Sequence, residues 1–186
     1  MKIESPVSIR SLFFIFLVSV LMMPIVIHAE PLIREVRIGI LDHDVDGLWS
    51  GSSYEEGTDF NAEVVFYPSW SFWGGAVRPN LGITLNDSGD TSKVYGGGLW
   101  EYSWGNGFFV GIGGGIAIHN GETDDTDKAN KKQLGSPVLF RITFETGFTM
   151  AKRHRISLMF DHISNGYLAE PNEGLDTLGI RYGILF

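Results

Sequence analysis

Hydrophobic and polar residues alternate with a period of two through most of the chain after residue 32. A β-strand sends successive side chains to opposite faces, so this alternation predicts strands with one apolar face and one polar face. Turn-forming segments rich in Gly, Pro, Asn and Asp separate the alternating stretches. The pattern indicates eight strands, at residues 33–41, 59–67, 76–85, 93–104, 108–118, 138–149, 156–164 and 176–186.

The length and polar face of these strands favour a membrane barrel. Strands of globular proteins average ~5–6 residues, whereas a tilted strand that crosses a membrane needs ~9–11. A soluble β-sandwich would show the same alternation, but an eight-stranded barrel encloses only enough space for side chains, which a balanced set of charges could fill. The polar face carries Arg37, Arg78, Arg141 and Arg181 together with Glu35, Glu63, Glu101, Glu145 and Asp161. We therefore expect an all-β, eight-stranded antiparallel transmembrane β-barrel of the outer-membrane type.

The connections between the predicted strands differ in length. The longer ones cover residues 42–58, 86–92, 119–137 and 165–175, and the shorter ones cover 105–107 and 151–154, with 68–75 a mild exception to this alternation. Outer-membrane barrels have short periplasmic turns, longer outside loops and aromatic girdles at the interfaces. This rule places both termini in the periplasm and directs strand 156–164 outward. The aromatic residues around Trp70, Trp73 and Trp104 fit an interfacial girdle.

The first 29 residues have the composition of a secretory signal peptide. Lys2 and Arg10 precede the apolar run 12–23, which is followed by Pro24 and by Ala29 at the expected cleavage point. The run is shorter than the ~20 residues of a spanning helix. We expect residues 1–29 to be cleaved and residues 30–186 to form a single barrel domain. Removal takes away two basic residues and one acidic residue, so the formal net charge of −8 becomes −9.

The overall composition excludes several functions. An acidic chain lacks the basic stripe that nucleic-acid binding requires, and the absence of cysteine excludes disulfides. Residues 42–47 open like a calcium loop, but Ser53 stands where the bidentate Glu is needed. We interpret this segment as a solvated acidic loop, and residues 125–133 as a mobile, solvated loop. No metal or organic cofactor is expected.

Three polar residues lie at one end of an apolar face. His162 and Ser164 share their parity with Ile156 and the other apolar residues of their strand, and Asp176 has the apolar parity of the last strand. An unpaired polar group in hydrocarbon costs a few kcal/mol. Hairpin pairing would bring Asp176 beside His162. The pattern predicts a nucleophile, base and acid, the alternative being a polar collar at the headgroup boundary.

The segment His162-Ile163-Ser164-Asn165-Gly166, followed by residues 171–174 and a last strand ending in Phe186, resembles the C-terminal signature of the PagL-type lipid A 3-O-deacylases. In that family the His is the base, the Ser is the nucleophile and a Glu on the next strand is the acid. The aligned position here is Asp176, with Glu173 as the alternative acid. Asn165 and Gly166 match the segment that offers oxyanion donors.

The resemblance implies an outer-membrane esterase that hydrolyses the 3-O-linked acyl chain of lipid A and releases a 3-hydroxy fatty acid. Its partners would be lipopolysaccharide and the outer membrane of a bacterial cell, with no nucleic acid and no cofactor. The alternative function is that of a non-enzymatic small barrel, structural or adhesive, whose loops make the contacts. The sequence leaves the oligomeric state open, a homodimer included.

Overall fold

The computed structural model describes residues 31–124 and 130–186. The strands in this part of the chain are β1 (Ile33–Asp42), β2 (Thr58–Phe66), β3 (Trp70–Phe72), β4 (Gly75–Asn86), β5 (Lys93–Ser103), β6 (Phe108–His119), β7 (Val138–Met150), β8 (His154–Ser164) and β9 (Leu175–Leu185). No helix in the described residues is long and apolar enough to cross a membrane. The signal peptide predicted at residues 1–29 lies outside the described residues, as do residues 125–129 of the loop predicted to be mobile.

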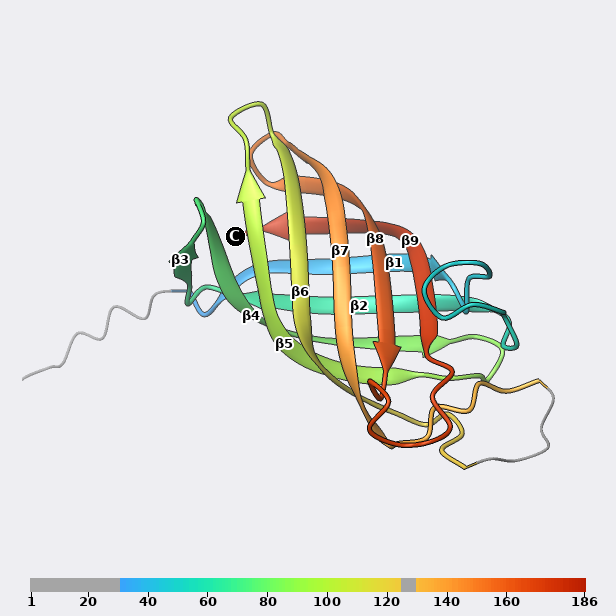
Figure 1. Ribbon diagram of the computed structural model, residues 1–186. Coiled ribbons are helices and arrows are strands. Elements are labelled where there is room, and N and C mark those ends of the chain that lie inside the picture. The colour runs from blue at the N-terminus through green and yellow to red at the C-terminus, as the bar shows by residue number, and fades with distance from the viewer. Residues whose placement is uncertain (1–30, 125–129) are drawn as a thin grey trace, which may run out of the picture. The chain divides into compact units, whose positions relative to one another are not determined.

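Eight of these strands close into an antiparallel barrel (Figure 1). The ring is completed where β1 pairs with both β2 and β9, and where β2 pairs with β4. Closure pairs the strand edges that would otherwise expose backbone groups to hydrocarbon. The predicted fold class is therefore confirmed. The ninth strand, β3, pairs with β4 beside the turn after β2, and its three residues are too few for an alternation to reveal it.

The two ends of the barrel differ in their connections (Figure 1). One end carries the short turns, and there the C-terminal Phe186 N–H bonds to the carbonyl of Arg34. The other end carries the first long loop (residues 43–57), the second (87–92), the third (120–137) and the fourth (165–174). Long loops of outer-membrane barrels face the outside of the cell. β8 therefore runs outward, and its last residue, Ser164, lies beside the long loops.

Strand alternation places apolar side chains on the outside of the barrel and charged side chains on the inside. On β1, Ile38 and Ile40 are 58% and 60% exposed, whereas Glu35 and Arg37 are 1% exposed. The outward residues are those that contact lipid in a membrane. Large aromatic residues are exposed at and near the short turns, as a membrane interface favours: Trp70, Phe72, Trp73, Trp104 and Phe148.

Opposite charges occupy much of the described interior of the barrel, beside buried apolar residues such as Leu99 and Phe109. Arg37 bonds to Glu35 and Glu145 at 2.8 Å each, and to Glu63 at 3.1 Å. Arg181 bonds to Glu145 at 2.6 Å. The cationic members of this interior charge network are Arg37, Lys93, Arg141, Arg155 and Arg181, and the anionic members are Glu35, Glu63, Glu101, Glu145 and Asp161. Because buried charges need partners to offset their desolvation, the equal numbers let the narrow interior fill without an unpaired ion.

Three of the four arginines predicted to face the interior are buried, the fourth is half-buried, and the interior holds one further arginine. Arg37, Arg141 and Arg181 are buried, whereas Arg78 has the inward parity, opposite Leu99, but is only half-buried. Arg155 was not predicted to face the interior, because it precedes Ile156, the first residue of the predicted strand. It is fully buried and bonds to Glu35 and Glu101. The fifth arginine of the polar parity thus extends the interior charge network toward the short turns.

Replacing Glu145 by Ala should destabilise the barrel, because Arg37 and Arg181 would both lose a carboxylate within 2.8 Å. Breaking a buried ion pair costs roughly 3–5 kcal/mol, and urea unfolding of the barrel in lipid vesicles would measure the loss. The exposed Glu170 provides the matched control, because Glu170→Ala should change the free energy of unfolding by less than ~0.5 kcal/mol. Equal stability of the two variants would show that the interior charge network does not stabilise the fold.

Candidate active site

The antiparallel register of β8 and β9 sets His162 directly opposite Asp176. His162 Nδ1 is 2.6 Å from Asp176 Oδ1, and His162 Nε2 is 3.0 Å from Ser164 Oγ. With the carboxylate accepting from Nδ1–H, the ring is the tautomer whose Nε2 carries a lone pair. Nε2 then accepts a hydrogen bond from the Ser164 hydroxyl. The structure thus joins carboxylate, imidazole and hydroxyl in one line, the order that an acid–base–nucleophile set requires.

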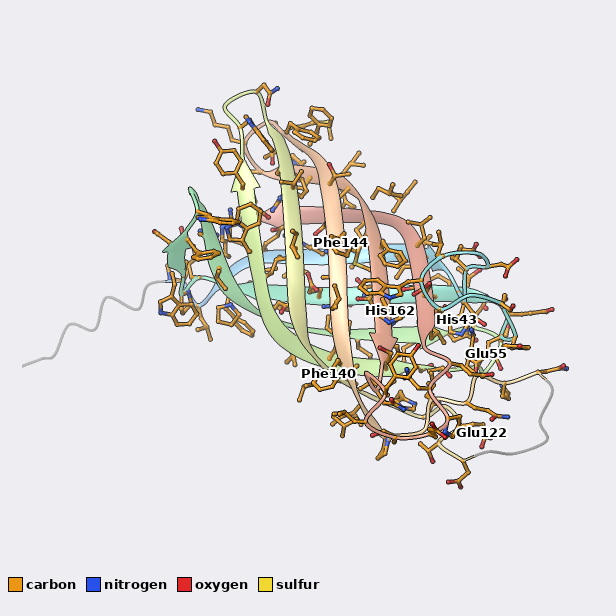
Figure 2. The ribbon with its side chains drawn as sticks, viewed as in Figure 1. His43, Glu55, Glu122, Phe140, Phe144 and His162 are labelled. Atoms are coloured by element: carbon orange, nitrogen blue, oxygen red, sulfur yellow. The ribbon has the colours of Figure 1, made fainter. Side chains whose placement is uncertain are left out.

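The first long loop folds over this line of side chains. The Trp49 indole stacks on the His162 ring, with ring centroids 4.5 Å apart and planes 12° from parallel. The backbone N–H of Ser50 donates to Asp176 Oδ2 at 2.7 Å, and the N–H of Val45 donates to the Asp176 carbonyl at 3.0 Å. Figure 2 shows His162 at the end of the barrel that carries the long loops. The candidate site is therefore built from three segments, β8, β9 and the first long loop.

This cover changes the expected exposure of the site. The outward parity predicts that His162 faces lipid, yet the residue is 6% exposed and Asp176 is 0% exposed. Trp49 and Ser50 were not predicted as site residues. The sequence offered one signal, since Leu48 and Trp49 are adjacent large apolar residues in a loop composed mostly of polar residues and glycine. Such a pair in a loop indicates a contact with another part of the protein, although it does not say which.

The fourth long loop holds the two residues predicted to offer oxyanion donors. Gly166 has a φ of +63°, a left-handed conformation that glycine adopts without strain. Asn165 is buried, its N–H donates to Asn172 Oδ1, and its side-chain amide donates to the carbonyls of Leu134 and Pro171. Among the described residues, the Gly166 N–H has no hydrogen-bond partner. Gly166 thus has a free donor, whereas the donors of Asn165 hold the loop in place.

Glu173, the alternative acid, lies elsewhere. Its Oε2 accepts the N–H of Gln133 at 2.6 Å, and the Gln133 carbonyl in turn accepts the N–H of Glu173. These bonds join the third and fourth long loops. The only carboxylate within hydrogen-bonding distance of His162 in the described residues is that of Asp176. The geometry therefore favours Asp176 as the acid.

A second buried polar cluster joins the long loops to one another, with Glu55 at its centre (Figure 2). Its carboxylate is 3.0 Å from His43 Nε2 and accepts the N–H of Lys132 at 3.1 Å. It also accepts the N–H and the hydroxyl of Thr91, each at 3.1 Å. These partners come from the first, second and third long loops. One carboxylate thus fixes the relative positions of three loops.

The same cluster corrects two predictions about solvated loops. Within the segment read as an acidic solvated loop, His43 and Asp44 are 4% and 1% exposed. Lys132, placed in the mobile loop, is 0% exposed, lies 3.3 Å from Asp44 Oδ1 and donates to the carbonyl of Ser52 at 2.5 Å. Charge composition alone could not reveal this, because opposite charges from distant loops neutralise one another only after folding.

The environment of His43 keeps it protonated at neutral pH. Burial alone lowers the pKa of an imidazole, but the hydrogen bonds and negative charges of Asp59 and Glu55 outweigh burial and raise the pKa of His43 from 6.5 to about 9. His43 Nδ1 is 2.8 Å from Asp59 Oδ1, so each ring nitrogen has its own carboxylate. An imidazolium between two anions therefore anchors the start of the first long loop.

Comparison with known proteins identifies relatives of this chain. The family model described as Lipid A 3-O-deacylase (PagL) matches residues 40–184, which include His162, Ser164 and Asp176. The lipid A deacylase PagL of Bordetella bronchiseptica is 31% identical over 147 residues, covering 73% of this chain and 79% of that protein. The crystal structure of the outer membrane enzyme PagL is similar in fold, with a TM-score of 0.62 at 19% identity, over 82% of this chain and 99% of that one.

The stability of the long loops should fall as pH rises from about 6.5 to about 9. Because the pKa of His43 is raised on folding, its contribution is fully present below about 6.5 and disappears once the folded imidazolium loses its proton near 9. The contribution is on the order of 3 kcal/mol. Hydrogen exchange of the amides of residues 43–57, corrected for intrinsic rates, should show protection falling between about pH 6.5 and about 9. The His43→Gln protein should lack this transition, and an identical pH dependence in both proteins would refute the assignment.

Proposed function

The chain belongs to the PagL family of lipid A 3-O-deacylases, and we propose that Ser164, His162 and Asp176 carry out its reaction. Family membership makes the protein an outer-membrane esterase that hydrolyses the 3-O-linked acyl chain of lipid A. The observation that supports the proposed mechanism is the line of hydrogen bonds from Asp176 Oδ1 through His162 to Ser164 Oγ. A serine hydroxyl needs such a base to attack an ester.

In the first half of the proposed reaction, Ser164 Oγ attacks the ester carbonyl while His162 Nε2 takes the hydroxyl proton. Asp176 stabilises the imidazolium that forms and keeps its ring in the correct tautomer. When the tetrahedral intermediate collapses, the bond between the carbonyl carbon and the sugar oxygen breaks. His162 returns its proton to that sugar oxygen. The products of this half are lipid A with a free 3-hydroxyl and an acyl group on Ser164.

In the second half, water attacks the acyl group on Ser164, with His162 again acting as the base. Collapse of the second intermediate breaks the bond to Ser164 Oγ, which regains its proton from His162, and a 3-hydroxy fatty acid leaves. Both intermediates carry an oxyanion that needs a hydrogen-bond donor. We assign this role to the free N–H of Gly166, and to Asn165 the role of holding the loop that presents it.

The acyl chain has an apolar path along the outside of the barrel. A groove of about 360 Å³ runs below the site, with walls that include Phe144, Leu158, Phe160 and Leu178. Phe160 and Leu178 share a face with His162 and Asp176, two residues nearer the membrane centre on each strand. We propose that the 3-O-acyl chain lies in this groove while its ester reaches Ser164. A substrate in the outer leaflet then need not leave the membrane.

Ser164→Ala and His162→Ala should each abolish most activity, because one removes the atom that forms the acyl-enzyme and the other removes its base. Losses of roughly 10⁴–10⁶-fold are expected for such residues. The double variant should be little worse than either single one, since the two act as a unit. Mass spectrometry of the fatty acid released from lipopolysaccharide by purified, folded barrel would measure the rates. Undiminished release by Ser164→Ala would end the proposed mechanism.

Variants at the two carboxylates should identify the acid. Asp176→Ala should lower activity about a hundredfold less than Ser164→Ala does, because an orienting carboxylate contributes less than the nucleophile or base. Asp176→Glu should also lower activity, since Ser50 N–H and His162 Nδ1 already hold the shorter carboxylate at 2.7 Å and 2.6 Å. Glu173→Ala is the matched control. If Glu173→Ala reduced the rate and Asp176→Ala did not, the acid would be Glu173.

A further inference from the structure

Both oxygens of the Asp176 carboxylate are engaged. Oδ1 faces His162 Nδ1 at 2.6 Å, and Oδ2 accepts the N–H of Ser50 at 2.7 Å. Rotation about the Cβ–Cγ bond of an aspartate is soft, because its torsion profile is broad and two-fold. A carboxylate held by one oxygen alone would therefore turn easily away from the imidazole. By fixing Oδ2, the Ser50 N–H also fixes the direction of Oδ1 toward His162.

The imidazole of His162 is held through its face as well as its edge. Its torsion about Cβ–Cγ is equally soft, and rotation would break the contact of Nε2 with Ser164 Oγ. The parallel Trp49 indole, 4.5 Å away, restricts that rotation. Trp49 also covers the ring face that the outward parity of β8 would otherwise expose to lipid. The strands thus bring His162 and Asp176 together, and the two contacts from the first long loop fix the orientation of their side chains.

The turn that carries Trp49 and Ser50 is itself anchored by contacts outside the site. The N–H of Gly47 bonds to the carbonyl of Gly51 at 2.8 Å, which closes the turn. Lys132 of the third long loop donates to the carbonyl of Ser52 at 2.5 Å, and Glu55 joins the end of the first long loop to its neighbours. These bonds hold the turn without any contact to substrate. Its position over His162 is therefore a property of the folded loops.

We infer, on the basis of the proposed function, that Trp49 and the backbone N–H of Ser50 are positioning residues for the deacylation. They hold the imidazole and the carboxylate in line with Ser164, and so they act on turnover rather than on lipid binding. Such pre-orientation of catalytic groups lowers the barrier without adding a reacting group. Trp49 is 57% exposed, so direct contact with the lipid is the competing role. The two roles differ in whether kcat or KM changes.

Replacement of Trp49 tests the stack. Trp49→Ala should lower kcat for acyl release from lipopolysaccharide by about tenfold or more with KM unchanged, whereas Trp49→Phe, which keeps a ring, should recover most of the rate. Leu48→Ala is the matched control, because Leu48 lies in the same turn and is 44% exposed. It should keep the wild-type kcat. A rise in KM at unchanged kcat in Trp49→Ala would assign Trp49 to lipid binding and overturn the inference.

Labelling of Ser164 by a fluorophosphonate separates positioning from the lipid reaction, because the reagent reports activation of the hydroxyl without lipid A. Trp49→Ala should slow labelling by a factor similar to its loss in kcat, and Leu48→Ala should not. If wild-type Ser164 is labelled and Trp49→Ala reacts equally fast, the positioning role is wrong while the Ser164 mechanism stands. If wild-type Ser164 is not labelled and Ser164→Ala retains activity, the proposed mechanism and the inference both fail.

A backbone ester tests the N–H of Ser50. Lactic acid at position 50 gives an alanine-like residue whose ester oxygen cannot donate, so it differs from Ser50→Ala by a single N–H. The ester protein should show kcat and a Ser164 labelling rate about tenfold or more below those of Ser50→Ala, because a hydrogen bond to a charged group is among the stronger kinds. Heat-modifiable migration on gels verifies that both barrels are folded. Equal rates in the two folded proteins would overturn the role of Ser50.

Discussion

Eight strands enclose a space that only side chains can fill, and this chain fills it with opposite charges. Arg37 lies within 3.3 Å of four carboxylates, and Arg181 shares two of them. The rest of the fold depends on this balance, because the outer surface is committed to lipid and cannot supply a conventional hydrophobic core. Charge pairing and apolar packing share the interior, where Tyr95, Leu139 and Ile163 belong to a buried apolar cluster. A rigid barrel of this kind gives β8 and β9 a fixed register, on which the site geometry rests.

The long loops outside the barrel also bury opposite charges in pairs. His43 and Glu55 of the first long loop meet Lys132 of the third in a buried cluster of charges that water does not reach. The free energy of such a cluster depends on every partner being present, because each lone ion would be costly to bury. The cluster consequently orders the first long loop as a unit. That order is transmitted to Trp49 and Ser50, which contact His162 and Asp176.

Local pattern predicted the barrel well and its loops poorly. Alternation with a period of two located β1 and β8 to within about two residues and placed Arg37 inside, because each strand residue has only two directions to face. For the same reason, the pattern placed His162, Ser164 and Asp176 together at one end of an apolar face. The contacts of Trp49 and Lys132 could not be predicted, because a loop has no period and its partners are distant in sequence. Composition suggested solvated loops where the fold neutralises the charges by pairing.

Strand pairing also explains how an aspartate can serve as the acid. Residues directly opposite on antiparallel strands have Cβ atoms ~4.5–5.5 Å apart, and His162 and Asp176 are such a pair. A side chain with one methylene spans this gap to His162 Nδ1, as the 2.6 Å contact shows. A longer carboxylate at the same place would have to fold back, and its second oxygen would lose the Ser50 N–H. Asp176 and the turn of the first long loop therefore fit each other, so the choice of Asp176 as the proposed acid and the position of the loop are one structural feature.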